Sequence, residues 1–123
     1  MRSYLIHTDA VKNYVLPQSN YSKSTEWLAY ADEADLLNVA LFGYTAKAWR
    51  EANPDLAKNY NIRDFASIAE LTVLSNLETH NAELIKSGLS KAERFEALRR
   101  IAEYQLRVLT EAERIKELPG GKE

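Results

Sequence analysis

The chain has 123 residues, 46% of them hydrophobic and 28% charged, which is the composition of one globular domain. Cysteine is absent, which excludes disulfides, thiolate nucleophiles and cysteine-based zinc sites and fits a reducing compartment. The formal net charge of −2 offers no bulk positive charge for a nucleic-acid backbone, and the N-terminus has too short an apolar run for a signal peptide or membrane span. We therefore expect a cytoplasmic protein with no membrane segment.

Residues 1–23 are predicted to form an N-terminal arm or linker. The stretch SYLI suits a short extended piece, and TDAVKNYVL suits one to two helical turns capped by Thr8. Pro17 ends whatever precedes it, because proline lacks the N–H group that a helix interior needs. The polar stretch PQSNYSKS that follows is typical of a linker.

The first predicted helix covers residues 25–43. Ser24 or Thr25 can accept a hydrogen bond as its N-cap, the acidic run 32–35 lies in its N-terminal half, and Gly43 can end it with a positive φ. Apolar residues recur at three- and four-residue spacing: Trp27, Leu28, Ala31, Ala34, Leu37 and Leu41.

A short second helix is predicted over residues 46–52. Thr45 caps its start, and Asn53 ends it because the residue before Pro54 avoids the helical region. A loop with one turn around Leu56 is expected to follow.

Two long helices are predicted over residues 68–87 and 91–117. Each begins with a capping box, SIAE from Ser67 and SKAE from Ser90, and Gly88 separates them. The short GLS connection predicts an antiparallel hairpin. Their expected inner faces comprise Leu71, Leu74, Leu77, Asn81, Leu84 and Ile85 in the first helix, and Phe95, Leu98, Ile101, Ala102, Leu109, Ala112 and Ile115 in the second. The fold class is all-α, a small helical bundle, with one domain over residues 24–118 and a tail over 119–123.

Nothing in the sequence has the spacing of a catalytic or metal site. His7 and His80 lie far apart, and Glu78 precedes His80 by two positions rather than the three of a di-metal E-x-x-H motif. Nucleophile-elbow, dinucleotide and P-loop motifs are absent. We therefore expect no catalytic residue, no cofactor, no metal and no enzymatic activity.

Two asparagines in the first long helix are candidates for a specific role. Asn81 occupies a position where the apolar stripe favours leucine, and Asn76 lies five residues earlier. A polar group on an inner face costs about 1–3 kcal/mol if it is unpaired, so it needs a partner. The residues act either as buried amides that fix helix register or as contacts to a partner or ligand.

The stretch LFGYTAKAWREANPDL is compatible with two structures. It can be a corner in which Trp49, with Leu41 and Phe42, packs against the long hairpin. It can also be part of a DNA-reading helix–turn–helix around residues 34–52, with contacts from Lys47, Arg50 and Arg63. Basic and acidic residues are interleaved in the last helix, which is typical of a solvated face rather than a phosphate-binding stripe.

Several segments together resemble a known family. EADLLNVALFG, TAKAWREANPD, NIRD and the NLE and NAELI pieces, within residues 30–109, resemble the C-terminal segment of bacterial and phage proteins that carry an N-terminal KilA-N domain. The resemblance implies a prophage or mobile-element setting and a helical accessory module. A KilA-N domain is not evident here, and the roughly 29 preceding residues are too few for one, so DNA binding does not carry over.

Three functions compete. The first is a non-enzymatic interaction module, a regulator or antitoxin-like partner that binds another protein or itself as a homodimer. The second is a DNA-binding regulator that uses the helix–turn–helix. A small enzyme ranks third, because it would have to work with carboxylates or tyrosines alone.

Overall fold

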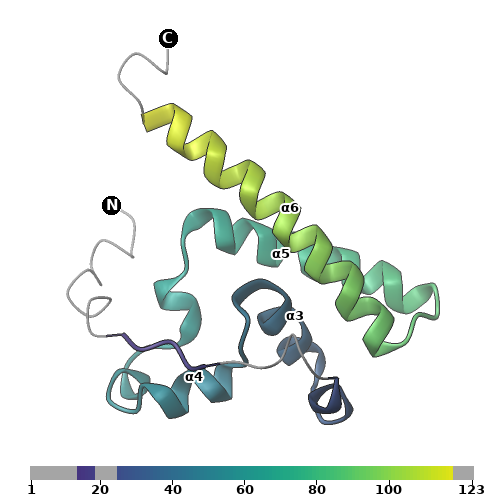
Figure 1. Cartoon of the computed structure of the whole chain (residues 1–123), viewed down its shortest axis with the longest axis horizontal. Coiled ribbons are helices and arrows are strands. Elements are labelled where there is room, and N and C mark those ends of the chain that lie inside the picture. Colours follow the sequence, from purple (N-terminus) through teal and green to yellow (C-terminus); the bar gives the residue numbers. More distant parts are fainter. Residues whose placement is uncertain (1–13, 19–24, 118–123) are drawn as a thin grey trace.

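The computed structural model describes residues 14–18 and 25–117, and all regular secondary structure in this part of the chain is helical, without a strand (Figure 1). Its α-helices are α3 (Glu33–Phe42), α4 (Ala46–Ala52), α5 (Ile68–Lys86) and α6 (Lys91–Glu117). The all-α prediction is confirmed. The predicted SYLI segment, the Thr8 cap, most of the linker and the tail at 119–123 lie outside the described residues. Of the helical turns predicted within residues 8–16, the structure describes 14–16, which are not helical.

The predicted helix over 25–43 is wrong in its first half. A 3-10 turn over Glu26–Ala29 stops at Tyr30, and α3 begins only after Asp32. The Asp32 carboxylate accepts a hydrogen bond from the Asp35 N–H (2.8 Å), and the Asp35 carboxylate accepts one from the Asp32 N–H (3.2 Å). This capping box holds Asp32 in an extended conformation, which a continuous helix cannot contain.

The corner after α3 is formed as the sequence predicts. Gly43 has a φ of +90° and donates its N–H to the Val39 carbonyl, which ends α3. Thr45 caps α4 by accepting a hydrogen bond from the Ala48 N–H (3.0 Å), and Asn53 ends the helix. The following loop contains two 3-10 turns, Leu56–Lys58 and Ile62–Phe65.

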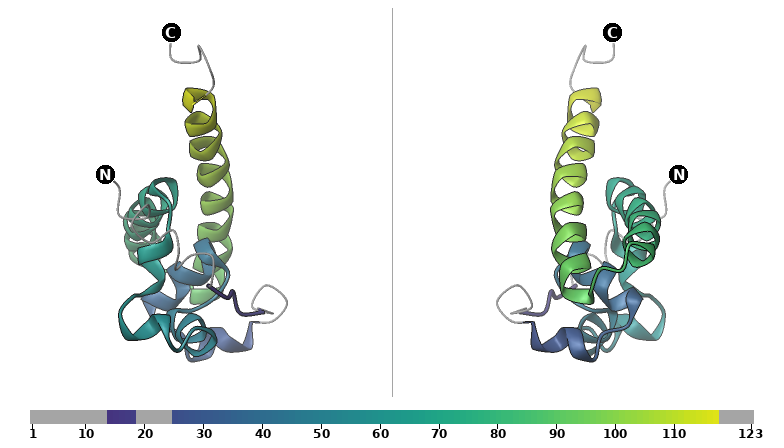
Figure 2. Two further views of the ribbon diagram at one scale, coloured as in Figure 1. Left: turned by 90° about the vertical axis from the view of Figure 1, so that its left-hand side faces the viewer. Right: turned by 90° about the vertical axis from the view of Figure 1, so that its right-hand side faces the viewer.

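Both predicted capping boxes are present in α5 and α6. Ser67 and Glu70 exchange hydrogen bonds of 2.8 and 3.0 Å at the start of α5, and Ser90 and Glu93 exchange bonds of 2.9 and 3.2 Å before α6. Figures 1 and 2 show α6 crossing α5 at an angle, with its last turns projecting away from the other helices.

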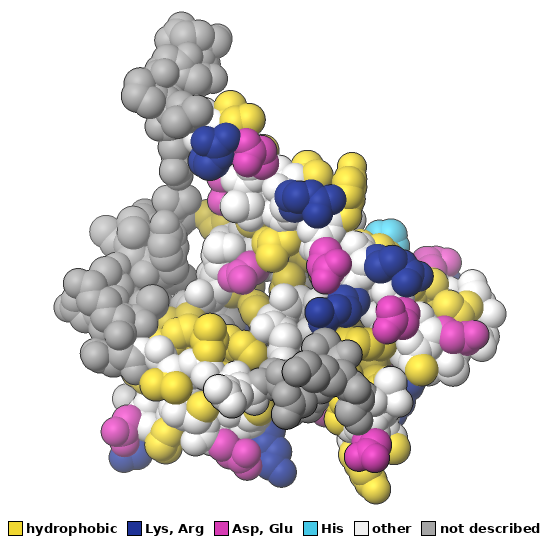
Figure 3. All heavy atoms as spheres, viewed as in Figure 1, with side chains coloured by type: hydrophobic (Ala, Val, Ile, Leu, Met, Phe, Trp, Pro, Cys, Tyr) yellow, Lys and Arg dark blue, Asp and Glu magenta, His cyan; other side chains and the backbone are white. Residues whose placement is uncertain are grey.

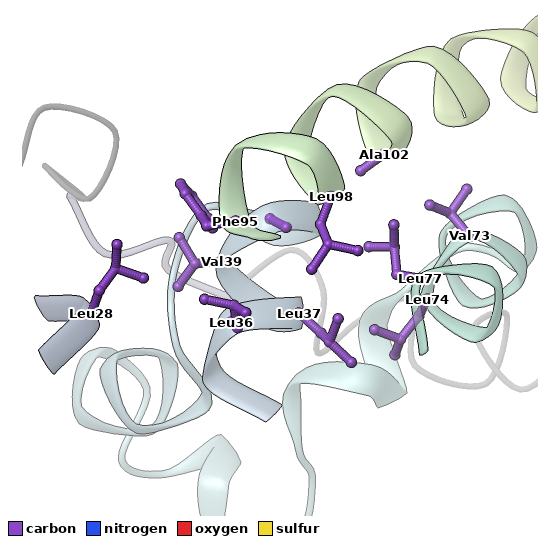
Figure 4. Close-up of a cluster of buried hydrophobic side chains, with 11 residues drawn as sticks. Leu28, Leu36, Leu37, Val39, Val73, Leu74, Leu77, Phe95, Leu98 and Ala102 are labelled. Atoms are coloured by element: carbon purple, nitrogen blue, oxygen red, sulfur yellow. The ribbon is translucent and has the colours of Figure 1, made fainter. Parts of the chain in front are cut away.

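The main core lies where α3, α5 and α6 meet (Figure 4). Its buried side chains are Leu28, Leu36, Leu37, Val39, Ala40, Val73, Leu74, Leu77, Phe95, Leu98 and Ala102.

Five residues predicted to face the core lie on the surface instead: Ala34, Leu71, Ile85, Ala112 and Ile115. The spacing of apolar residues predicts which face of a helix is apolar. A neighbouring helix covers that face only where α3, α5 and α6 meet, so apolar residues beyond this region stay exposed. Val73, which the predicted stripe omitted, is fully buried.

A second, aromatic cluster lies around α4. Trp49 is fully buried there, with ring centroids 6.0 Å from Tyr14 and 5.7 Å from Phe65. Phe42 joins Trp49 as expected, but the expectation that Leu41 does so and that the corner packs against the long helices is wrong. Leu41 joins the main core, whereas Phe42 and Trp49 belong to the aromatic cluster.

Part of the predicted arm is held against this cluster. The Asn53 side chain donates to the Val15 carbonyl (2.6 Å) and to the Trp49 carbonyl (2.9 Å), and it accepts from the Val15 N–H (2.6 Å). Asn53 thus ties the end of α4 to the backbone at residue 15, which sequence reasoning did not anticipate.

Candidate functional site

A polar junction connects the three core helices. Asn81 of α5 donates from Nδ2 to Glu33 Oε1 (2.8 Å), and Arg94 of α6 donates to Glu33 Oε2 (2.9 Å). Asn81 and Arg94 are each 5% exposed, whereas the Glu33 side chain is 48% exposed. One carboxylate at the start of α3 therefore joins both longer helices, and its outer side remains in contact with water.

The junction also holds the turn before α3. The Lys91 ammonium donates to the carbonyls of Ala31 and Leu28. Asn81 Oδ1 and Arg94 Nε are buried without a hydrogen-bond partner among the described residues. Sequence reasoning identified Asn81 but not Glu33, Lys91 or Arg94. The sequence pointed to these three residues only indirectly, because a buried Asn81 needs a hydrogen-bond partner.

Asn76 has a different environment from Asn81. It is exposed and donates from Nδ2 to Gln105 Oε1 of α6 (2.9 Å). It borders a groove between the first turns of α5 and the last turns of α6, which comprises two adjacent hollows of about 180 and 240 Å³. We call this the α5–α6 groove; its lining includes Ile68, Thr72, Asn76, Gln105, Leu109 and Ala112.

An apolar stripe runs along α6 at the edge of this groove, and its members Tyr104, Val108 and Ala112 also line the groove. Its members recur at three- and four-residue spacing and form what we call the α6 outer stripe: Ala97, Ile101, Tyr104, Val108, Ala112 and Ile115. Ile101 is partly buried and also packs against the main core. Tyr104 is 60% exposed, and Val108 and Ile115 are each 46% exposed. Large apolar side chains aligned in this way are typical of a surface that contacts another molecule.

Charges of both signs border the α6 outer stripe (Figure 3). Arg100 pairs with Glu96 at 3.8 Å, and the Arg107 guanidinium lies 5.8 Å from the centre of the Tyr104 ring. The hydrogen bond from Arg114, followed by its charge, holds the pKa of the Glu111 carboxyl below its usual value. This mixed pattern does not form the one-sign stripe that tracks phosphates.

The three residues suggested for DNA contact are all exposed. Lys47 and Arg50 lie on α4, and Arg63 lies on the 3-10 turn Ile62–Phe65, which packs beside α4. The acidic Glu51 is exposed on the same helix. The three basic side chains are therefore accessible from solvent, but the surface around them also carries a negative charge.

Residues 14–18 and 25–117 contain no cluster of three or more side chains able to hold a metal ion. His80 is exposed on α5, and His7 lies outside the described part. None of the described helices is long and apolar enough to cross a bilayer.

Comparison with known proteins identifies no relative: no family model matches the chain, and neither a curated protein nor a solved structure shows significant similarity to it.

Proposed function

We propose that the chain is a non-enzymatic helical interaction module that forms a homodimer through the α6 outer stripe. The observation that carries this proposal is the exposure of Tyr104, Val108 and Ile115 along one side of a single helix. Burying such side chains in an interface is favourable by roughly 25 cal/mol for each Å² of apolar surface removed from water. In this proposal α5 and α6 act as an antiparallel hairpin, in which α5 braces α6 from the core side.

The charges beside the stripe favour a second copy of the chain as the occupant. A two-fold symmetric interface has to be complementary to itself, so its border needs both signs of charge. An antiparallel pair of α6 helices centred near Gln105 sets Arg107 of each copy opposite Glu103 of the other, and Arg114 opposite Glu96.

The biological setting that we propose rests on the sequence resemblance. A dimeric helical module without reaction chemistry suits a cytoplasmic regulator or antitoxin-like partner in a prophage or mobile element. A different protein partner would bind at the α5–α6 groove, whose lining includes Tyr104, Val108 and Ala112 of the stripe, so it would compete with the dimer.

The dimer is tested with Val108→Asp. Light scattering after size exclusion is expected to give the wild type twice the chain mass of 14.0 kDa. Val108→Asp should weaken the dimer at least about tenfold, because a charge buried at its centre costs more than about 1.4 kcal/mol. Thr110→Asp is the matched control, since Thr110 is exposed on the opposite side of α6 and should leave the mass unchanged.

Charge reversal tests the arrangement of the two helices. Arg107→Glu should weaken the dimer, and adding Glu103→Arg should restore it. A wild type that stays monomeric at the highest attainable concentration contradicts the proposal. A dimer that Val108→Asp leaves intact would place the interface elsewhere.

A DNA-binding regulator is the second candidate, favoured by the exposure of Lys47, Arg50 and Arg63. It predicts a gel shift of random duplex at about 50 mM salt, because phosphate contacts dominate non-specific affinity at low ionic strength. Replacing all three residues with alanine should abolish the shift. Absence of a shift with the wild type argues against this candidate.

A further inference from the structure

A cavity of about 200 Å³ lies beside the aromatic cluster, apart from the α6 surface. Four aromatic side chains from different elements line it: Tyr14 from the arm, Phe42 from α3, Tyr44 from the following turn, and Phe65 from the last 3-10 turn. Glu70, in the first turn of α5, also lines the cavity. Leu41 also lines the cavity and packs against the main core, but the four aromatic residues and Glu70 do not belong to that core, so the cavity lies at its edge.

The polar groups in this lining are well defined. The Tyr14 and Tyr44 hydroxyls are hydrogen-bonded at 2.8 Å, and Glu70 Oε1 accepts from the Ser67 N–H at 2.8 Å. Burial raises the pKa of Tyr44 far above its usual value, with further contributions from the hydrogen bond to Tyr14 and from the charges of Tyr14 and Glu70. Tyr44 therefore stays neutral, and Glu70 supplies the only formal charge among the lining residues, which include no Lys, Arg or His.

We propose that this cavity binds a small organic cation, an alkylammonium or alkylguanidinium group. Aromatic rings attract cations through the negative charge density of their faces, and the Glu70 carboxylate adds a full opposite charge. An anion would be repelled, and a neutral hydrocarbon would desolvate Glu70 without compensation. Drug-sized ligands occupy pockets of about 300–1,000 Å³, so this smaller cavity suits a single side-chain-sized group.

The test is calorimetric titration of the whole protein with butylammonium and with 1-butanol, a neutral molecule of the same length. Butylammonium should bind at least about tenfold more tightly, as expected for a partly desolvated cation beside aromatic rings and a carboxylate. Equal binding of the two probes, or no binding of butylammonium, overturns the proposal.

Glu70→Gln separates the charge of Glu70 from its structural role. Glutamine can fill the same position of a capping box, so α5 should keep its start while the cavity loses its charge. Butylammonium affinity should fall about tenfold or more in Glu70→Gln. Glu93→Gln makes the same change in the α6 capping box, away from the cavity, and should leave affinity unchanged. An equal response of the two variants overturns the proposal.

Further probes identify the source of the cation. N-acetyl-lysine amide and N-acetyl-arginine amide represent side chains of a protein partner, whereas butylammonium represents a free amine. Binding of the amino-acid amides assigns the cavity to a partner's side chain, and binding of butylammonium alone assigns it to a metabolite amine. The binding results do not depend on whether the chain forms a dimer through α6.

Discussion

Replacing Trp49 with alanine is expected to lower the free energy of unfolding by about 3–5 kcal/mol, the usual cost of truncating a buried aromatic side chain. Trp49 is fully buried and contacts Tyr14 and Phe65, which come from segments on either side of α4 in the sequence. The truncation would thus remove the residue around which the second cluster is organised, and a cavity would remain.

Urea denaturation followed by circular dichroism measures this loss. Lys47→Ala is the matched control, because Lys47 is exposed on the same short helix and its truncation should change stability by less than about 0.5 kcal/mol. If Trp49→Ala left stability unchanged and reduced DNA binding, the corner would be a DNA-reading element rather than a packing element.

The parts of the fold that depend on neighbouring residues could be predicted from the sequence. The capping boxes at Ser67 and Ser90, the Thr45 cap and the left-handed Gly43 are each set by side chains within a few positions of the backbone groups they satisfy. Chemistry on that scale is visible in a short window of sequence.

The break before α3 could not be predicted from periodicity. Leu28, in the 3-10 turn, and Leu36, in α3, are buried in the same cluster, so the apolar spacing continues across the break. From its position in the sequence, Asp32 is expected only to place a negative charge in the N-terminal half of a helix. In the structure it ends one segment and begins the next, because a second acidic side chain lies three residues later.

The extent to which a helix is covered also depends on the tertiary structure. Ile115 has the correct spacing for the inner face of α6, but the last turns of α6 extend past the helices that would cover it (Figure 2). The cavity beside Tyr14 is likewise formed by segments far apart in the chain. The only local sign of the polar junction was Asn81, since Glu33 and Arg94 are 61 positions apart.

The second large effect concerns this junction, where the two members of the ion pair are expected to differ in their contributions. Glu33→Gln should destabilise the protein by about 3 kcal/mol, because it leaves the Arg94 guanidinium buried without a counter-charge. Arg94→Met should cost only about 1 kcal/mol, since the Glu33 carboxylate is half-exposed and can be solvated by water. Arg94→Met removes the hydrogen bond between the two residues, and Glu33→Gln weakens it. The larger loss of stability is nevertheless expected for Glu33→Gln, because the charge that it leaves unpaired is the buried one.

A double-mutant cycle in urea denaturation tests this asymmetry. Combining Glu33→Gln with Arg94→Met should cost less than the sum of the single variants, because methionine removes the buried charge that Glu33→Gln leaves unpaired. Glu83→Gln is the control: it makes the same change in an exposed pair with Lys86, where less than about 1 kcal/mol is expected. Equal losses for Glu33→Gln and Glu83→Gln would mean that Arg94 gains access to water in solution, and that apolar packing alone holds α3 against α6.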